Sequence, residues 1–338
     1  MTVFEIAEKA GVSIGTVDRV LHNRGRVSAK TKEKIQRIID EEGYQPNPLA
    51  RHLRRKDHIR IGVLIPRHDS ESGYWRLVWN GLKKAVAEFS AFSFTLQAFE
   101  FTRPNERSLK TAFRKMEEAD CTAWIIAPIM QESCMALITA SKVPRPFICI
   151  DSPLPGSSAR STIAQDPFRG GFLAGRIMDI FVPAGTCFGV VRPYTGAYNL
   201  NERSRGFNEW FAAKETVTVL DCICSEDNQK ETYEMLDSVF DGNPDLSGLF
   251  TVSSIAHKVA DYLDQRKSKK RITLIGYDLV PYNERYLITG KIDCLISQRP
   301  EEQGRLAIQE IYKAFVLQEK KGTSVSVPLD IFFKENLI

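Results

Sequence analysis

The chain has 338 residues, 43% of them hydrophobic and 26% charged, which are the proportions of a globular protein that can bury a core in two or three domains. No window approaches about 18 consecutive apolar residues, which excludes a membrane span, and no basic start leads into an apolar run, which predicts a cytoplasmic protein without a signal peptide. The net charge of +4 is carried by residues 1–57, with 12 basic and 8 acidic side chains, and this excess predicts a small polyanion-binding module on a neutral body.

Residues 1–46 show only helical signals and predict a small all-α head. Thr2 and Glu5 form a capping box for a first helix, which Gly11 ends. Ser13 and Ser28 are in position to cap two further helices. We expect these helices over residues 14–21 and 29–42, with an inner face formed by Val17, Val20, Leu21, Ile35, Ile38 and Ile39.

Residues 47–58 predict a linker that contains a short hinge helix. Asn47 is a good N-cap, and Pro48 occupies the first helical position, where its missing N–H is harmless. The helix expected over residues 48–55 is shorter than the roughly 12–15 residues that an isolated helix needs. It is therefore expected to order only when a partner holds it.

From residue 59 onward, short apolar strands alternate with amphipathic helices. This alternation predicts parallel sheets covered by helices, and the number of strands predicts an α/β body of two doubly wound lobes. A ligand is then expected at the carboxyl ends of the strands. The expected strands are 59–65, 92–99, 123–129, 146–150, 187–191, 217–223, 248–252, 272–276 and 293–297.

Signals for a cofactor, a metal or catalysis are missing or weak. The segment "PRHDSESGYW" after the first strand lacks the glycines of a dinucleotide site, and no phosphate-binding G-x-x-x-x-G-K-[ST] occurs. Cys222 and Cys224 are the only closely spaced cysteines, and two thiols do not make a zinc site. We therefore expect reduced, buried thiols, no metal and no cofactor.

The segment from Gly11 to Gly15 fits G-x-S-x-G, the signature of a hydrolase nucleophile elbow. Such an elbow requires a strand before the serine, whereas residues 2–10 carry a helix capping box. The same letters fit the turn and second helix of a helix-turn-helix. The sequence therefore predicts a protein that is not an enzyme.

The stretch "FEIAEKAGVSIGTVDRVLHNRGRVSAKTKEKIQRIIDEEGYQPNPLARHL" resembles the DNA-binding head of the lactose-repressor (LacI) type of bacterial transcription regulators. The shared features are A-G-V-S, T-V-x-R-V, V-S-x-K-T, the G-Y-x-P-N turn and A-R-x-L. The body resembles the periplasmic-binding-protein type I domain of the same family through "GYW", "IAQDPFRGGFLAG", "NERSRGF", "IGYDLVP" and "ISQRPEEQG". The resemblance implies a DNA-binding regulator, by default a repressor, that binds a small effector between its two lobes.

It also implies that the chain crosses three times between the lobes, and we place these crossovers near residues 162–166, 289–292 and 322–326. We expect lobe 1 to hold residues 59–162 and 291–322, and lobe 2 to hold residues 163–290 and 323–338.

By this resemblance, the helix over residues 14–21 enters the major groove with its N-terminal residues at the base edges. Arg19 either reads guanine O6 and N7 or clamps a phosphate, and Ile14 either contacts a thymine methyl or is simply exposed. Ser13 and Thr16 offer hydrogen bonds to phosphates. A second group approaches the DNA backbone from the start of the next helix, namely Ser28, Lys30 and Thr31.

Two positions of the reading helix stand out. Gly15 is either a tolerated flaw or a point where the backbone approaches DNA closely. Asp18 stands where the family usually has Ser, and it is either balanced by Arg19 or Lys9 or accepts from a cytosine amino group. The sequence leaves these alternatives open.

In the hinge, the resemblance matches Leu53 to an apolar wedge that opens a base step in the minor groove. The alternative is that Leu53 packs on its own domain. Two hinges of a homodimer would order together on a pseudo-palindromic double-stranded operator. The residues beside the wedge are Asn47, Ala50, Arg51 and Arg54.

Effector contacts are expected at strand and helix ends of the body. Tyr74 and Trp75 match the family's stacking pair, with plain core aromatics as the alternative. Ser253 and Ser254 replace the usual Asn-Asp pair, so a bidentate clasp for hydroxyls is lost. The remaining candidate contacts are Asp151, Arg203, Asp278 and Gln298.

The class of effector stays open at this point. A sugar or sugar derivative suits the family, whereas Arg203 together with Arg192 would suit an anionic sugar acid or phosphorylated sugar. The sequence predicts a cytoplasmic regulator at the bacterial nucleoid, and the alternative is a small-molecule receptor without a DNA function. It does not indicate whether the effector releases the protein from DNA or recruits it.

Overall fold

The computed structural model divides the chain into two compact units, Met1–Arg55 and Lys56–Ile338. It describes residues 1–21, 23–44, 58–68, 73–184, 186–193, 196–225, 228–266 and 270–337. We call residues 1–44 the head and residues 58–337 the body. The predicted hinge helix, with Asn47, Ala50, Arg51, Leu53 and Arg54, lies outside the described residues.

The head is built from three helices, α1 (Val3–Ala10), α2 (Ile14–Leu21) and α3 (Ala29–Glu41). The predicted capping box is confirmed, since the Thr2 hydroxyl accepts from the Glu5 N–H and the Glu5 carboxylate accepts from the Thr2 N–H. Gly11 ends α1 with φ 67°, a conformation that glycine adopts without strain. The small core consists of Ile6, Ala7, Ala10, Val17, Val20, Ile35 and Ile39.

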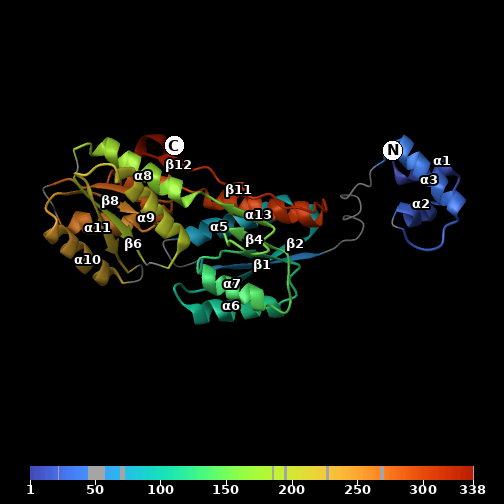
Figure 1. The fold of residues 1–338 in the computed structure, drawn as a ribbon, viewed down its shortest axis with the longest axis horizontal. Coiled ribbons are helices and arrows are strands. Elements are labelled where there is room, and N and C mark those ends of the chain that lie inside the picture. Colours follow the sequence, from blue (N-terminus) through green and yellow to red (C-terminus); the bar gives the residue numbers. More distant parts are fainter. Residues whose placement is uncertain are drawn as a thin grey trace. The chain divides into compact units, whose positions relative to one another are not determined.

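The body contains two six-stranded sheets, each with helices on both faces (Figure 1). In lobe 1 the strand order is β11-β5-β4-β3-β1-β2, with every pairing parallel. Its strands are β1 (Ile59–Pro66), β2 (Phe94–Phe101), β3 (Ala123–Ile126), β4 (Phe147–Ile150), β5 (Ser161–Ala164) and β11 (Val325–Ser326). Its helices are α5 (Tyr74–Glu88), η2 (Ser90–Phe92), α6 (Glu106–Glu118), α7 (Gln131–Ala140) and α13 (Pro300–Phe315).

Lobe 2 repeats this plan with strand order β12-β10-β9-β8-β6-β7, where only the β10–β12 pair is antiparallel. Its strands are β6 (Cys187–Arg192), β7 (Thr218–Ile223), β8 (Leu246–Thr251), β9 (Thr273–Tyr277), β10 (Cys294–Ser297) and β12 (Asp330–Phe332). Its helices are α8 (Pro167–Phe181), α9 (Tyr198–Phe211), α10 (Gln229–Gly242), α11 (Ala256–Arg266), α12 (Pro281–Ile288) and η3 (Lys334–Asn336).

Two of the three expected crossovers are placed wrongly by the sequence. The first falls between β5 and α8, as expected, but the second follows β10 at residues 298–299 rather than 289–292. The third falls between β11 and β12 at residues 327–329 rather than 322–326. The reason is that β10 pairs with β9 in lobe 2 and β11 pairs with β5 in lobe 1, and a strand's own sequence does not reveal which sheet it joins.

Helices α8 and α9 approach each other closely because glycines face the partner backbone. A Cβ at Gly171 of α8 would lie 1.8 Å from the Arg203 carbonyl oxygen, and a Cβ at Gly206 of α9 would lie 2.0 Å from the Phe168 carbonyl oxygen. Both distances are far below van der Waals contact, so only glycine fits at either position. This contact fixes the position of α9, and with it that of Arg203.

Candidate functional site

Helix α2 exposes its N-terminal residues, as a DNA-reading helix requires. The Ser13 hydroxyl accepts from the Thr16 N–H at 3.2 Å and lies 3.0 Å from the Thr16 hydroxyl. Ile14 is 44% exposed although it is apolar. A free apolar side chain at this position is consistent with the expected contact to a thymine methyl.

Arg19, on the same helix, packs along the turn that connects α2 with α3. A Cβ added to Gly25 would lie 3.5 Å from Arg19 Cδ, and the Arg24 N–H donates to the Arg19 carbonyl at 2.8 Å. Within the described part of the head, the Arg19 guanidinium makes no hydrogen bond or ion pair. Its stem is therefore positioned while its donors remain available for a base or a phosphate.

The start of α3 offers a second polar edge. Ser28 caps the helix by accepting from the Thr31 N–H at 3.2 Å, and the two hydroxyls lie 2.7 Å apart. Lys30 is exposed beside them. One of the two balancing partners considered for Asp18 is engaged elsewhere, because Lys9 donates to Glu42 at 2.5 Å.

Gly15 lies in open space, since a Cβ there would meet only the Ser13 hydroxyl oxygen, at 3.8 Å. We therefore expect Gly15→Ala to stabilise the head by about 1 kcal/mol through helix propensity alone. Thermal unfolding of the head and operator titration on the same variant distinguish the two interpretations of Gly15, a tolerated flaw and a point of close approach to DNA. A head that is more stable but binds DNA less tightly indicates close backbone approach, and unchanged DNA binding indicates a tolerated flaw.

In the body, the candidate side chains gather at the carboxyl ends of the parallel strands. Asp151 follows β4, Asp278 follows β9, and Gln298 follows β10. Asp151 and Asp278 have φ values of 66° and 61°, a region that residues other than glycine seldom adopt and that costs backbone strain. We call the group Tyr74, Asp151, Asn199, Arg203, Asp278 and Gln298 the cleft cluster.

Asp151 connects the two lobes. One carboxylate oxygen accepts from the Tyr74 hydroxyl of α5 at 2.9 Å, and the other accepts from Asn199 Nδ2 of α9 at 2.9 Å. The Asp151 N–H donates to Gln303 of α13 at 2.9 Å. Because α5 belongs to lobe 1 and α9 to lobe 2, the Asp151 carboxylate bridges the two lobes.

Arg203 organises the lobe 2 side of the cluster. Nη1 donates to the Val252 carbonyl and Nη2 to Gln298 Oε1, both at 2.8 Å, and the guanidinium lies 3.8 Å from the centre of the Tyr277 ring. With its amide oriented to satisfy both ends, Gln165 also accepts from Arg203 Nη2 at 2.9 Å. Gln298 Nε2 in turn donates to Asp278 at 3.1 Å.

The charges in this cluster are shielded from water, since Asp151 and Asp278 are each 2% exposed and Arg203 is 1% exposed. Burial raises the pKa of Asp278 to about 6, and the Arg203 guanidinium opposes part of that rise. Burial also raises the pKa of Asp151, again against the influence of Arg203. The cluster therefore holds two carboxylic groups whose ionised forms depend on one guanidinium.

This arrangement predicts a pH dependence of stability. A group whose pKa is raised by folding stabilises the fold below its unfolded pKa and loses that contribution as pH rises through the folded pKa. For Asp278 the window runs from 3.8 to about 6. Between pH 5 and pH 8 we expect the wild-type body to lose roughly 1.4 kcal/mol more unfolding free energy than Asp278→Asn, which cannot ionise.

Denaturant unfolding of both proteins at the two pH values checks this expectation. Arg203 and Asp151 are present in both proteins, so the difference between the two proteins isolates the contribution of Asp278. Parallel losses in the two proteins would contradict the pH assignment.

The other candidates lie around the cluster. Trp75 is buried and meets Tyr74 edge to face, with ring centres 5.0 Å apart. Ser253 and Ser254 follow β8 and are both buried. Ser253 is 7% exposed, and its hydroxyl has no hydrogen-bond partner among the described residues. A bound ligand could supply the missing hydrogen bond.

Sequence reasoning missed Asn199, Gln165 and Gln303. Asn199 had a usable signal, since it precedes Arg203 by four residues and therefore shares its helix face. Gln165 and Gln303 had no such signal, because they reach Arg203 and Asp151, respectively, only through contacts between segments distant in sequence.

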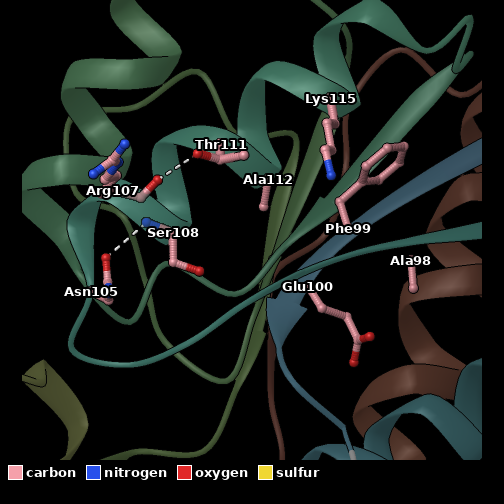
Figure 2. Close-up of a pocket in the computed structure, with 9 residues that line it drawn as sticks. All are labelled: Ala98, Phe99, Glu100, Asn105, Arg107, Ser108, Thr111, Ala112 and Lys115. Atoms are coloured by element: carbon pink, nitrogen blue, oxygen red, sulfur yellow. Dashed lines mark hydrogen bonds between the residues drawn. The ribbon is translucent and has the colours of Figure 1, made fainter.

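A hollow of about 560 Å³ lies apart from this cluster, between β2 and α6 (Figure 2). It contains none of the residues that the sequence singled out. The hydroxyls of Ser108 and Thr111 on its wall are already engaged, since the Ser108 hydroxyl accepts from the Thr102 N–H at 2.9 Å and the Thr111 hydroxyl donates to the Arg107 carbonyl at 2.8 Å. The cleft cluster remains the candidate ligand site.

Three further observations bear on the function class. All seven cysteines are buried free thiols. Among the described residues, no group of three or more His, Cys, Asp or Glu side chains could hold a metal ion. In the same part of the chain, no helix has the length and apolar character needed to cross a membrane.

Two lobes with three crossovers and a buried polar cluster between them define the periplasmic-binding-protein class, and residues 61–320 match the family described as periplasmic binding protein domain. Residues 2–47 match the family described as bacterial regulatory proteins, lacI family. The chain therefore belongs to the periplasmic-binding-protein domain family, and its head matches the DNA-binding domain of the lacI-family regulatory proteins.

Relatives of known name agree with this assignment. The transcriptional regulator DegA of Bacillus subtilis is 27% identical over 177 residues, which cover 52% of this chain and 50% of DegA. The regulator AscG of Escherichia coli is 44% identical over 64 residues, 19% of each chain. The chain thus spans about half the length of DegA and less of AscG.

Solved structures share the fold of the body. A Bacteroides fragilis protein assigned to the LacI transcriptional regulators has a TM-score of 0.77 at 24% identity, over 83% of this chain and 99% of that one. A Burkholderia graminis transporter solute-binding protein in complex with D-arabinose has a TM-score of 0.75 at 19% identity, over 82% of this chain and 96% of that one. At these identities the likeness concerns the fold alone.

Proposed function

We propose that this protein is a DNA-binding transcriptional regulator, by default a repressor, whose operator affinity is controlled by a small carbohydrate-like effector bound in the cleft cluster. The observation that carries the proposal is the joining in one chain of a LacI-family head to a two-lobed body. The head offers a reading helix with an exposed N-terminus, and the body offers buried polar groups that bridge two lobes.

The cleft cluster suits a polyhydroxylated ligand. Its carboxylates accept hydrogen bonds, its amides donate and accept, and Tyr74 provides an aromatic face. The bonds that Asp151 now makes to Tyr74 and Asn199 would be exchanged for bonds to ligand hydroxyls. Since Asn199 of lobe 2 donates to Asp151 of lobe 1, such an exchange would change how the lobes are held together.

On the DNA side, we propose that a homodimer in the bacterial cytoplasm binds a pseudo-palindromic operator at the nucleoid. Helix α2 would read the major groove through Ile14, Gly15 and Arg19, with Asp18 modulating the preference. Phosphates would be held by Ser13, Thr16, Ser28, Lys30 and Thr31. The hinge residues Asn47, Ala50, Arg51, Leu53 and Arg54 would order on the minor groove.

The test selects duplexes from a random library with the full chain and then titrates the best duplex with and without candidate effectors. We expect enrichment of half-sites whose centres lie about 10 bp apart, affinity that falls steeply with salt, and a change in affinity on adding the effector. Equal binding to all duplexes would overturn the proposal, as would an operator affinity that no cleft ligand changes.

The hinge can be tested separately. We expect Leu53→Ala to weaken operator binding by ten-fold or more while leaving binding to random duplex nearly unchanged, because only a specific complex bends DNA around the wedge. Titration of both duplexes with wild type and variant measures the effect. Equal losses on the two duplexes would show that Leu53 is not a wedge.

A further inference from the structure

The charged groups of the cleft cluster are engaged by neutral polar partners of the protein, and this bears on which ligands can enter. Arg203 meets the Val252 carbonyl, Gln298 and the Tyr277 ring on three sides, and Gln165 takes a further donor. A guanidinium with this many partners has little capacity left for an incoming anion. It faces two buried carboxylic groups, Asp151 and Asp278, so the inner cluster already carries an excess of acidic groups.

The second guanidinium that the sequence put forward as an anion receptor is also neutralised. Arg192 at the end of β6 donates through Nε to Asp221 of β7 at 2.6 Å and through Nη2 to the other oxygen of that carboxylate. Its Nη1 donates to Asn201 at 2.8 Å. This bidentate pair raises the pKa of Arg192 and leaves its charge balanced by Asp221.

One more cationic side chain, Arg103, acts electrostatically on Asp151. Burial raises the pKa of Asp151, and Arg203 opposes that rise more strongly than Arg103, which lies in the loop after β2 and has interactions of its own. It therefore does not convert the inner cluster into an anion site.

We propose that the cleft selects uncharged polyhydroxy ligands and rejects sugar acids and sugar phosphates, with Asp278 as the residue that sets this preference. This inference rests on the proposed function and narrows its ligand class. A neutral ligand brings hydroxyl donors for the carboxylates and needs no counter-charge. An anion would be placed, almost without water, next to two acidic groups whose main positive partner, Arg203, is already engaged.

The test uses the full chain and matched ligand triplets, each an aldose with its uronic or aldonic acid and its terminal phosphate. D-arabinose, D-glucose, D-galactose and D-allose supply the neutral members. Thermal shift finds the triplets that bind, and calorimetry measures Kd for each member. Within a binding triplet we expect the neutral member to bind at least 100-fold more tightly than either anion.

Two variants test the cause. Asp278→Asn is expected to reduce the preference for the neutral member at least ten-fold, because it removes one of the two competing negative charges. Arg192→Gln is the matched control and should leave the preference unchanged.

The outcomes are distinct. An anionic member that binds as tightly as its neutral partner overturns the charge rule while leaving the proposed effector function intact. A selective loss of anion binding in Arg192→Gln overturns it as well, since Arg192 would then be an anion receptor. If no member of any triplet binds or changes operator affinity, the proposed carbohydrate effector fails and this inference fails with it.

Discussion

Replacing Arg203 by methionine is expected to destabilise the body by about 3–5 kcal/mol and to abolish effector binding. Methionine keeps much of the stem volume but removes the guanidinium that bonds Val252 and Gln298 and covers Tyr277. Asp151 and Asp278 then remain buried without their positive partner, and the Val252 carbonyl loses its donor. Denaturant unfolding of the full chain, followed by calorimetry with the best ligand, measures both effects.

Arg205, two residues further along α9, provides the matched control. Its guanidinium donates to the Glu202 carboxylate and, like that of Arg203, covers an aromatic ring, here Phe168, but the side chain is exposed to solvent. We expect Arg205→Met to change stability far less, because water replaces the lost bonds. Unfolding of the two variants at the same denaturant concentration would contradict the central role of Arg203.

A single methyl group in the interface between α8 and α9 should also have a large effect. Gly171→Ala places a Cβ where the Arg203 carbonyl oxygen lies only 1.8 Å away, so the two helices must separate. We expect overpacking to lower the free energy of unfolding by about 1–3 kcal/mol. Alanine in place of a helical glycine usually raises that free energy. Because α9 carries Asn199 and Arg203, we also expect weaker effector binding.

Gly242, in the last turn of α10, is the control for this substitution. Nothing lies within 4 Å of a Cβ at that position, so Gly242→Ala should be neutral or slightly stabilising. Thermal unfolding of the two variants decides between them. If Gly171→Ala is as stable as Gly242→Ala and binds ligand normally, then α9 is not fixed by close contact with α8.

The position of Asn199 illustrates the limit of sequence reasoning about the site. The helix spacing places it on the same face as Arg203, but only the structure shows that its amide reaches Asp151, which belongs to the other lobe and lies 48 residues earlier. The opposite holds for Arg192. Its charge and its place at the end of a strand suggested an anion site, and the pairing of β6 with β7 places Asp221 beside it.

The strands also divide into those that the sequence predicts and one that only the structure reveals. The apolar runs predicted nine strands, and each is present with shifted ends. The short strand β5, "STIA", escaped notice because four residues with two hydroxyls give no clear alternation. It is held by β4 on one side and by β11 on the other, and β11 lies more than 150 residues further along the chain.

The sequence by itself determined the three capped helices of the head, the alternation of strands and helices in the body, and the family to which the chain belongs, because caps, turns and hydrophobic periodicity are local properties of neighbouring residues. Only the tertiary structure decided where the chain crosses between the lobes, which acceptors occupy Arg203, and how Asp221 neutralises Arg192. The physical reason is that each of these depends on pairings between segments distant in sequence. Whether a buried charge is available to a ligand is decided by its neighbours in space.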